Sequence, residues 1–457
     1  MDRRETILTK PVRTLLVRFG LPSVLAMVIN TLYSVVDRIF VGKGVGEDAL
    51  AAVTVCFPML MIMMALGMLI ALGGSTLISL YLGQDNRARA EKVVGNGFTI
   101  IVVTMGLFMV GIMFNLERLL YLFGANEATI GDARSYMLII LLGSIPHEIG
   151  FGINTYIRGE GNIRYSVTTS IVGALANILF DYLLVFVIPL GVKGVAIGTV
   201  SAWSIRMMMV LAFYYRKKGL LRFRARDIKP DFQLIGRMLS IGLAPCSMQL
   251  LGSAALIYLN RSLLHYGGNT AVALYGVGMS LFQVVAMFVR GMGAGAQPII
   301  GFNFGAGQYE RVRRCLADLG SATVLVSAAG AALLVSFPVF FLSLFTGNAS
   351  GLVELGPTCL RIYVCMLPFA GVNMLILQYF QSVGRAGKAL LLSVCRLGIF
   401  MPACLLFITN LISPTLFGVW IALPAADFLA GALSLALIIP EWRGALRRAN
   451  EPLGTKP

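Results

Sequence analysis

Twelve long hydrophobic segments alternate with short polar loops along the 457-residue chain. A helix needs about 20 mostly apolar residues to cross a bilayer, and each segment reaches that length. The segments cover about residues 12–38, 49–72, 93–114, 134–156, 164–187, 193–215, 235–260, 270–293, 316–341, 356–380, 388–409 and 415–439. The pattern predicts an all-α integral membrane protein with twelve transmembrane helices.

Composition agrees with this pattern and excludes a globular protein. Hydrophobic residues make up 58% of the chain and charged residues 13%, and the mean hydropathy is +0.83. The first apolar segment continues to full spanning length, so we expect an uncleaved first helix. The seven cysteines form no CxxC pair and there are only two histidines, which indicates small core residues rather than a metal site.

The basic residues predict orientation rather than a nucleic-acid partner. The net charge is +16, but most Lys and Arg fall in the N-terminus, the even-numbered loops and the C-terminus. Basic loops stay in the cytoplasm. We therefore expect a multi-pass plasma-membrane protein whose N- and C-termini are cytoplasmic, with no nucleic-acid partner.

The two halves of the chain resemble copies of each other. Phe19 to Pro22 (FGLP) recurs as Ile241 to Pro245 (IGLAP), and Tyr156 to Gly161 (YIRGEG) recurs as Tyr379 to Gly384 (YFQSVG), about 222 residues later. Because each half has an even number of spans, the copies are parallel repeats. Such a pair of bundles is typical of alternating access, although a duplication is also compatible with a purely structural role.

The repeats predict four parts of the chain. We expect an N-terminal six-helix bundle at residues 1–215 and a basic cytoplasmic linker at 216–234. A C-terminal six-helix bundle follows at 235–440, with a cytoplasmic tail at 441–457. The predicted fold is thus two six-helix bundles, an N-lobe and a C-lobe.

The first span carries a proline, Pro22, and an aspartate, Asp37. An aspartate deep in hydrocarbon costs roughly 2.5 to 3.5 kcal/mol, so we expect Asp37 to face a protein-lined cavity, and Pro22 to kink the helix. Asn30 and Tyr33 lie on roughly the same helix face. The alternative is that Asp37 sits at a hydrated helix end.

The fifth and sixth spans offer a group of oxygen ligands. Asn177 and Asp181 are four residues apart and share one helix face, and Thr199 follows in the next span. Carboxylate and amide oxygens bind small hard cations, and a desolvated aspartate takes up a proton more readily. This group predicts a site for H⁺ or Na⁺; interhelical hydrogen bonding is the structural alternative.

The second half carries fewer charges within its spans. Its polar residues include Gln249 and Asn373, and its charged ones are Arg396 and Asp427. This asymmetry indicates ion coupling in the N-terminal half and substrate surface in the other. The role of Asp427 stays open, a structural pair with a basic neighbour being one reading.

At these motifs the chain resembles the multidrug and toxic compound extrusion (MATE) family, in its DinF/MepA-like branch. The matching stretches are GLPS, VVDRIFVGKGVGEDALAAV, LGQDNRARAEKV, RGEGN, ANILFDYLLVF and GAGAQPIIGFNFGAGQYERVRR. The resemblance implies a twelve-helix, two-lobed antiporter, not an enzyme. It would export cationic or amphipathic drugs in exchange for H⁺ or Na⁺, with no other cofactor, and a monomer is the family expectation.

The resemblance also assigns roles to individual residues. It implies a cation or proton site at Asp37, Asn177, Asp181 and Thr199, with Tyr136 nearby. It implies that Asn30, Tyr33 and Asn154 face the substrate. Where the family's other branch has acidic residues in the seventh and tenth spans, this chain has Gln249 and Asn373, which we assign to substrate surface rather than to a second sodium site.

Four other functions are weighed against drug export. A flippase for lipid-linked oligosaccharides shares the two-lobe plan, but it would need several arginines for pyrophosphate, and the first half's spans hold few basic groups. A membrane-embedded enzyme is disfavoured by the lack of histidine and metal-ligand clusters, and a scaffold by the buried acids. An ATP-driven pump lacks its G-x-x-x-x-G-K-[ST] loop.

Overall fold

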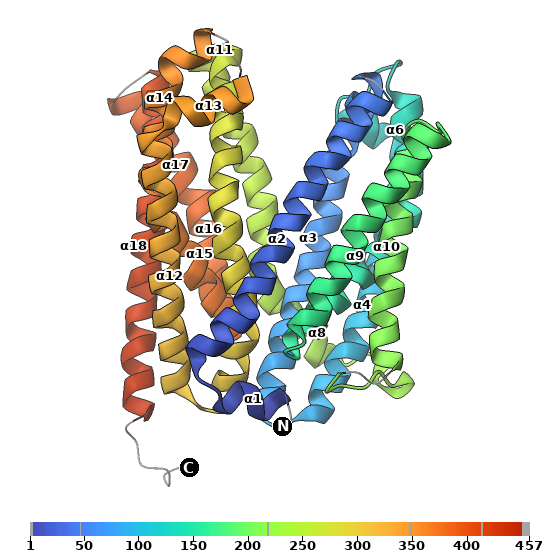
Figure 1. Cartoon of the computed structure of the whole chain (residues 1–457), viewed down its shortest axis with the longest axis vertical. Coiled ribbons are helices and arrows are strands. Elements are labelled where there is room, and N and C mark those ends of the chain that lie inside the picture. The colour runs from blue at the N-terminus through green and yellow to red at the C-terminus, as the bar shows by residue number, and fades with distance from the viewer. Residues whose placement is uncertain (1–2, 46, 217–218, 347–349, 413–414, 450–457) are drawn as a thin grey trace. The chain divides into compact units, whose positions relative to one another are not determined.

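The computed structural model describes residues 3–45, 47–216, 219–346, 350–412 and 415–449. Within these ranges the side chains of residues 33–39, 41–44, 47–50, 225, 345–346, 350–354, 411–412 and 444–449 are not described. The regular structure of the described residues is helical throughout (Figure 1). This confirms the all-α prediction.

The first repeat contains ten α-helices and three short helical turns of other types. The α-helices are α1 (Arg3–Thr9), α2 (Val12–Gly44), α3 (Glu47–Gly83), α4 (Arg87–Phe114), α5 (Leu116–Leu122), α6 (Ile130–Leu142), α7 (Ser144–Glu148), α8 (Asn154–Gly159), α9 (Ile163–Tyr182) and α10 (Val192–Tyr215). Two π-helical turns, η1 (Ile149–Ile153) and η2 (Leu183–Val187), and one 3₁₀ turn, η3 (Ala225–Ile228), complete it.

The second repeat begins inside a 74-residue helix, α11 (Phe232–Gly305). The helices after it are α12 (Tyr309–Ser336), α13 (Pro338–Thr346), α14 (Ser350–Val364), α15 (Leu367–Ser382), α16 (Ala386–Val394), α17 (Met401–Phe407) and α18 (Leu416–Ala449). Two π-helical segments, η4 (Cys395–Phe400) and η5 (Ile408–Ile412), flank α17.

The described helices supply the predicted twelve spans. Ten are long and apolar enough to cross a membrane as they stand, and α6 with α7 and α8 forms another, bent by 53°. α11 contains two of the twelve, because Gly268 breaks its helical geometry with a φ of 64°, a conformation that glycine adopts without steric cost. The twelve-helix, two-lobe prediction is confirmed.

The chain divides into two compact units, and two helices are each shared between them. Unit 1 comprises Met1–Thr9 and Leu25–Cys246, and unit 2 comprises Lys10–Val24 and Ser247–Pro457. The division falls just after Pro22 in α2 and just after Pro245 in α11. In this division each unit contains the first part of a helix whose remainder belongs to the other unit; the bounds of the N-lobe and the C-lobe stay a prediction.

Both exchanged half-helices pack closely against a glycine-bearing helix. In unit 2, a Cβ on Gly295 would lie 2.6 Å from the carbonyl oxygen of Phe19 in α2. In unit 1, a Cβ on Gly73 of α3 would collide with the carbonyl of Met238 in α11. Gly73 and Gly295 are one repeat apart, so the duplication extends to this backbone contact, which small residues permit between membrane helices.

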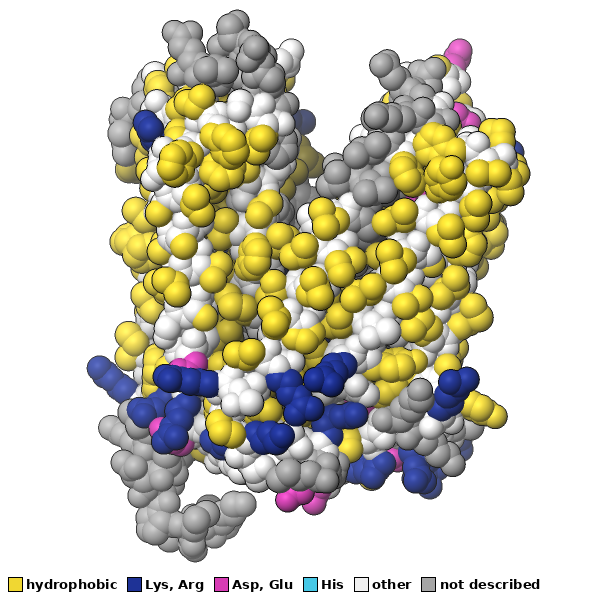
Figure 2. All heavy atoms as spheres, viewed as in Figure 1, with side chains coloured by type: hydrophobic (Ala, Val, Ile, Leu, Met, Phe, Trp, Pro, Cys, Tyr) yellow, Lys and Arg dark blue, Asp and Glu magenta, His cyan; other side chains and the backbone are white. Residues whose placement is uncertain are grey.

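Basic and apolar side chains occupy different parts of the helices in each unit. Figure 2 shows Lys and Arg side chains gathered toward one end of the helices, while hydrophobic side chains cover their length. The exposed hydrophobic residues of the spans include Leu21, Leu107 and Leu325, which are 69%, 70% and 70% exposed. Such a surface suits a lipid environment with a basic interface at one end.

The linker that follows α10 is held against unit 1 by polar side chains. Glu91 accepts a hydrogen bond from the backbone N–H of Arg222 at 3.2 Å. Asn96 accepts one from the N–H of Asp231 at 2.7 Å, and Thr99 donates one to the carbonyl of Ile228 at 2.8 Å. The predicted linker is therefore a docked strap over the start of α4.

Glu160, between α8 and α9, is the most buried anchor of this strap. Its side chain is 0% exposed, and its Oε2 accepts hydrogen bonds from the N–H groups of Leu220 at 2.9 Å and Leu221 at 3.2 Å. Burial raises the pKa of the Glu160 carboxyl from 4.5 to about 7. The two N–H groups and the charges of Arg3 and Arg87 act in the opposite direction.

We expect this carboxyl to make the free energy of unfolding fall as the pH rises from about 4.5 to about 7. The unfolded chain releases the Glu160 proton near pH 4.5 and the folded protein near pH 7, so the folded protein holds more protons in between. The shift corresponds to a stabilisation on the order of 3 kcal/mol, present at low pH and lost through pH 7. Thermal unfolding in detergent at stepped pH measures it; Glu160→Gln should flatten the curve, and an unchanged slope would contradict the assignment.

Candidate functional site

Buried oxygen atoms from α9 and α10 meet inside unit 1. Asn177 and Asp181 are 4% and 1% exposed and lie one turn apart on α9. The Nδ2 of Asn177 donates a hydrogen bond to Oγ1 of Thr199 on α10, at 3.4 Å. The Oδ1 of Asn177 is buried and has no hydrogen-bond partner among the described residues. The structure thus brings three predicted ligands together on two neighbouring helices.

A glycine on α10 makes room for the aspartate. A Cβ on Gly198 would collide with Oδ1 of Asp181 and lie 3.2 Å from its backbone nitrogen. The carboxylate therefore rests directly against the backbone of α10, one residue before Thr199. Any side chain at this position would force the carboxylate to move.

We expect Gly198→Ala to destabilise the protein by roughly 1 to 3 kcal/mol, the usual cost of overpacking. Thermal unfolding in detergent measures the loss. Gly111→Ala in α4 is the matched control, because a Cβ there meets nothing within 4 Å; equal stability of the two variants would contradict this role for Gly198.

The structure describes the remaining residues predicted for this site to different extents. The backbones of Tyr33 and Asp37 lie in α2, but their side chains are outside the described residues. Asn30 is half-buried on the same helix. Tyr136 of α6 is 6% exposed and belongs to a hydrophobic cluster that includes Val195 and Ala196 of α10, so it packs on the side of the helix that carries Thr199.

Two asparagines predicted to face substrate join helices instead in the described arrangement. Asn154 is 0% exposed; its Nδ2 donates to the carbonyl of Ser166, and its Oδ1 accepts from Oγ1 of Thr169 at 2.7 Å. Asn373 of unit 2 is 1% exposed and donates to Oγ of Ser434 at 2.8 Å. This geometry favours a structural role for both, and their contact with substrate stays a prediction. Gln249 is half-buried on α11.

One buried acid of unit 1 was missed by sequence reasoning. Glu148 in the fourth span is 0% exposed and pairs with Nδ1 of His147 at 2.9 Å. Its Oε2 has no hydrogen-bond partner among the described residues, and a Cβ on Gly67 of α3 would collide with it. The π-helical turn η1 follows directly, as often occurs at functional positions. An intramembrane carboxylate beside a histidine was the available signal.

Unit 2 holds a buried ion pair within its spans. Asp427 of α18 accepts from Nε of Arg396 at 3.0 Å and from its Nη2 at 2.9 Å, and both side chains are 14% exposed. The pair neutralises both charges within the spans. Asp427 therefore has the basic neighbour that the sequence left open. Among the residues named above, unit 2 has no group of oxygen ligands like the one in unit 1.

No resident metal cluster accompanies these groups. Among the residues that the structure describes, no three or more His, Cys, Asp or Glu side chains are arranged to hold a metal ion. The oxygen set at Asn177, Asp181 and Thr199 is of the type that binds a small hard cation or, at the aspartate, a proton.

Twelve spans in two repeats, with carboxylates buried inside them, define a polytopic membrane transporter. The MatE family model matches residues 22–183 and 245–406, one match in each repeat, beginning at Pro22 and Pro245. The chain belongs to this family, the MATE transporters.

Curated relatives are similar over most of the chain. The Multidrug export protein MepA of Staphylococcus aureus (strain NCTC 8325 / PS 47) is 23% identical over 435 residues, which cover 94% of each chain. The protein of the same name from Staphylococcus saprophyticus is 22% identical over 401 residues, 86% of each chain. The family match confirms the predicted MATE family; the MepA-like branch stays a prediction, with which these similarities agree.

Solved structures share the fold. Crystal structures of MATE in the bent and in the straight conformation superpose with a TM-score of 0.91 at 21% identity, and each covers 98% of this chain and 100% of its own. At this identity the likeness shows the fold alone.

Proposed function

We propose that the protein is a secondary active antiporter that exports cationic or amphipathic drugs in exchange for H⁺ or Na⁺. The observation that carries the proposal is the buried carboxylate of Asp181 beside Asn177 and Thr199 in unit 1. Carboxylates inside membrane-spanning bundles are rare and commonly mark ion pathways or proton relays. The relatives named multidrug export proteins support the drug class.

The proposed coupling site comprises Asp37, Asn177, Asp181 and Thr199, with Tyr136 at its side. Three of these offer oxygen atoms on adjacent helices, and Oδ1 of Asn177 is available for a cation or for a protonated carboxyl. Asn30, Tyr33 and Gln249 remain proposed contacts for substrate. No cofactor other than the coupling ion is required.

The proposed mechanism is alternating access driven through the first helix. α2 contains Pro22 and carries Asp37, and it passes from unit 2 to unit 1 just after the proline. Ion binding at Asp37 and Asp181 would change how α2 packs and so shift the balance between two states. A ligand shifts such a balance only by its differential affinity for them.

The cellular setting follows from the charge pattern. We propose that the protein is a monomer in the plasma membrane. Both termini and the basic helix ends would face the cytoplasm, because basic loops are retained there. Drug would then leave on the opposite side.

Transport into proteoliposomes tests the proposal. A cationic dye is followed while an H⁺ gradient, a Na⁺ gradient or neither is imposed across vesicles that contain the full chain. We expect dye to move against its own gradient with one of the ions and not without it. Dye movement that ignores both ions, or movement of a lipid-linked sugar instead of dye, would contradict the proposal.

A further inference from the structure

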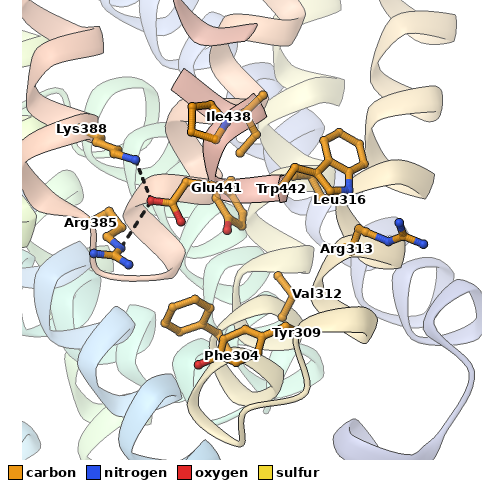
Figure 3. Close-up of a pocket in the computed structure, with 12 residues that line it drawn as sticks. Phe304, Tyr309, Val312, Arg313, Leu316, Arg385, Lys388, Ile438, Glu441 and Trp442 are labelled. Carbon is orange, nitrogen blue, oxygen red and sulfur yellow. Dashed lines mark hydrogen bonds and ion pairs between the residues drawn. The ribbon is translucent and has the colours of Figure 1, made fainter. Parts of the chain in front are cut away.

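A cavity lies at one end of unit 2, where four helices begin or end. Its volume is about 200 Å³. Figure 3 shows Tyr309 and Arg313 from the start of α12 and Lys388 from the start of α16, with Arg385 just before it. Glu441 and Trp442 of α18 lie between these walls. The cavity is separate from the residues proposed for ion coupling, and no function discussed above uses it.

The cavity carries more positive charge than its own carboxylate neutralises. Glu441 accepts from Nζ of Lys388 at 2.6 Å, and Nε of Arg385 lies 3.7 Å from the same Oε1. Arg313 on the opposite wall pairs with Glu310, at 3.0 Å, outside the lining. The three cations are 36% to 46% exposed. The lining thus has three cations and one anion, which favours an anionic ligand.

The residues at the equivalent positions in unit 1, one repeat earlier in the sequence, bind the linker. Arg313 corresponds to Glu91, and Val383 corresponds to Glu160, at the offsets that relate the two halves. In unit 1 those two glutamates accept hydrogen bonds from the backbone N–H groups of the linker strap. In unit 2 an arginine replaces one of these glutamates and a valine replaces the other. This end therefore lacks the two carboxylates that accept hydrogen bonds from the linker strap in unit 1. Its arginine instead favours a ligand that is rich in hydrogen-bond acceptors.

The other lining residues are of the types that occur at the interface between lipid headgroups and acyl chains. Leu316 and Ile438 are apolar, and Trp442 and Tyr309 are of the types that gather where lipid headgroups meet the acyl region. Figure 2 shows basic side chains gathered toward one end of the helices, and the lining of the cavity has three of them, Arg313, Arg385 and Lys388. The tail that follows is itself basic at Arg443, Arg447 and Arg448, which disfavours the tail as the occupant.

We propose that this cavity binds an acidic phospholipid, with the phosphate among Arg313, Arg385 and Lys388 and the acyl chains against Leu316 and Ile438. Basic pockets between membrane helices recognise anionic headgroups in this way. Glu441 holds two of the cations in place and competes with the phosphate for them. The fraction of the protein with a lipid in this cavity would therefore depend on how much acidic phospholipid the surrounding leaflet contains.

Lipid retention by the purified full chain tests the proposal. The protein is equilibrated in nanodiscs of phosphatidylcholine with increasing phosphatidylglycerol, and bound lipid is counted by native mass spectrometry after gentle extraction. We expect the triple variant Arg313→Gln, Arg385→Gln, Lys388→Gln to lose its preference for phosphatidylglycerol, by about fivefold for each cation removed. The matched control Lys92→Gln, Lys229→Gln, Arg237→Gln removes the same charge from exposed positions in unit 1 and should retain the preference.

A second variant moves binding in the opposite direction, which misfolding cannot imitate. Glu441→Gln removes the competing carboxylate and should increase phosphatidylglycerol retention severalfold. Glycerol phosphate at millimolar concentration should not displace the lipid; displacement would point to a soluble phosphate instead. Equal retention in both triple variants, no gain in Glu441→Gln, or lipid binding that appears only after deletion of residues 450–457 would overturn the proposal.

Discussion

Replacement of Asp181 by asparagine is expected to lower ion-driven drug efflux between about 5- and 150-fold, the range of a typical coupling free energy. The carboxylate is 1% exposed and lies against the α10 backbone at Gly198, beside Asn177. Asparagine has nearly the same shape but neither takes up a proton nor balances a cation. The change should therefore remove coupling without opening a cavity. Efflux of a cationic dye from energised vesicles measures it.

Two controls separate coupling from folding in this experiment. Asp132→Asn alters an exposed acid at the start of α6 and should leave efflux unchanged. Dye binding by the Asp181→Asn protein in detergent should persist, because the substrate contacts proposed at Asn30 and Gln249 lie on other helices. Full efflux by Asp181→Asn would show that this carboxylate plays no part in coupling.

Replacement of Arg396 by glutamine is expected to destabilise the protein by about 3 to 5 kcal/mol. The guanidinium makes two contacts of 3.0 and 2.9 Å with Oδ1 of Asp427 inside the spans of unit 2. Removal of one partner leaves the other as an uncompensated buried charge. Thermal unfolding in detergent measures the loss.

The paired replacement distinguishes a structural ion pair from a functional one. Arg396→Met together with Asp427→Leu keeps the volume and removes both charges, so stability should return to near the wild-type value or exceed it. Arg118→Gln, at an exposed position, should have little effect. A double variant that is no more stable than the single one would show that the pair does more than neutralise itself.

Hydrophobic length and internal repetition were enough to predict the fold. The two prolines, Pro22 and Pro245, marked the start of each copy, and the family matches begin at the same two residues. The exchange of Lys10–Val24 and of residues before Ser247 between the units was not predicted. Loops suggest where a bundle ends, but the packing of Gly295 against Phe19 and of Gly73 against Met238 decides which unit a half-helix joins.

The candidate site was predicted in part, for a geometric reason. The four-residue spacing of Asn177 and Asp181 determines that they share a face of α9, and Thr199 follows on the adjacent helix. Sequence does not tell whether a buried amide faces a ligand or a neighbouring helix, as Asn154 and Asn373 illustrate. Glu148 was missed because its burial depends on Gly67, about 80 positions earlier in the chain.

The most direct test of ion coupling at the oxygen cluster of unit 1 uses a gradient of drug to drive movement of the ion. Vesicles containing the protein receive an outward gradient of drug and no ion gradient, and internal pH and Na⁺ are recorded. Our account predicts that drug movement drives one of these ions uphill in the wild-type protein and neither ion in Asp181→Asn. Equal ion movement in the two proteins, or none in the wild-type protein while drug crosses, would contradict it.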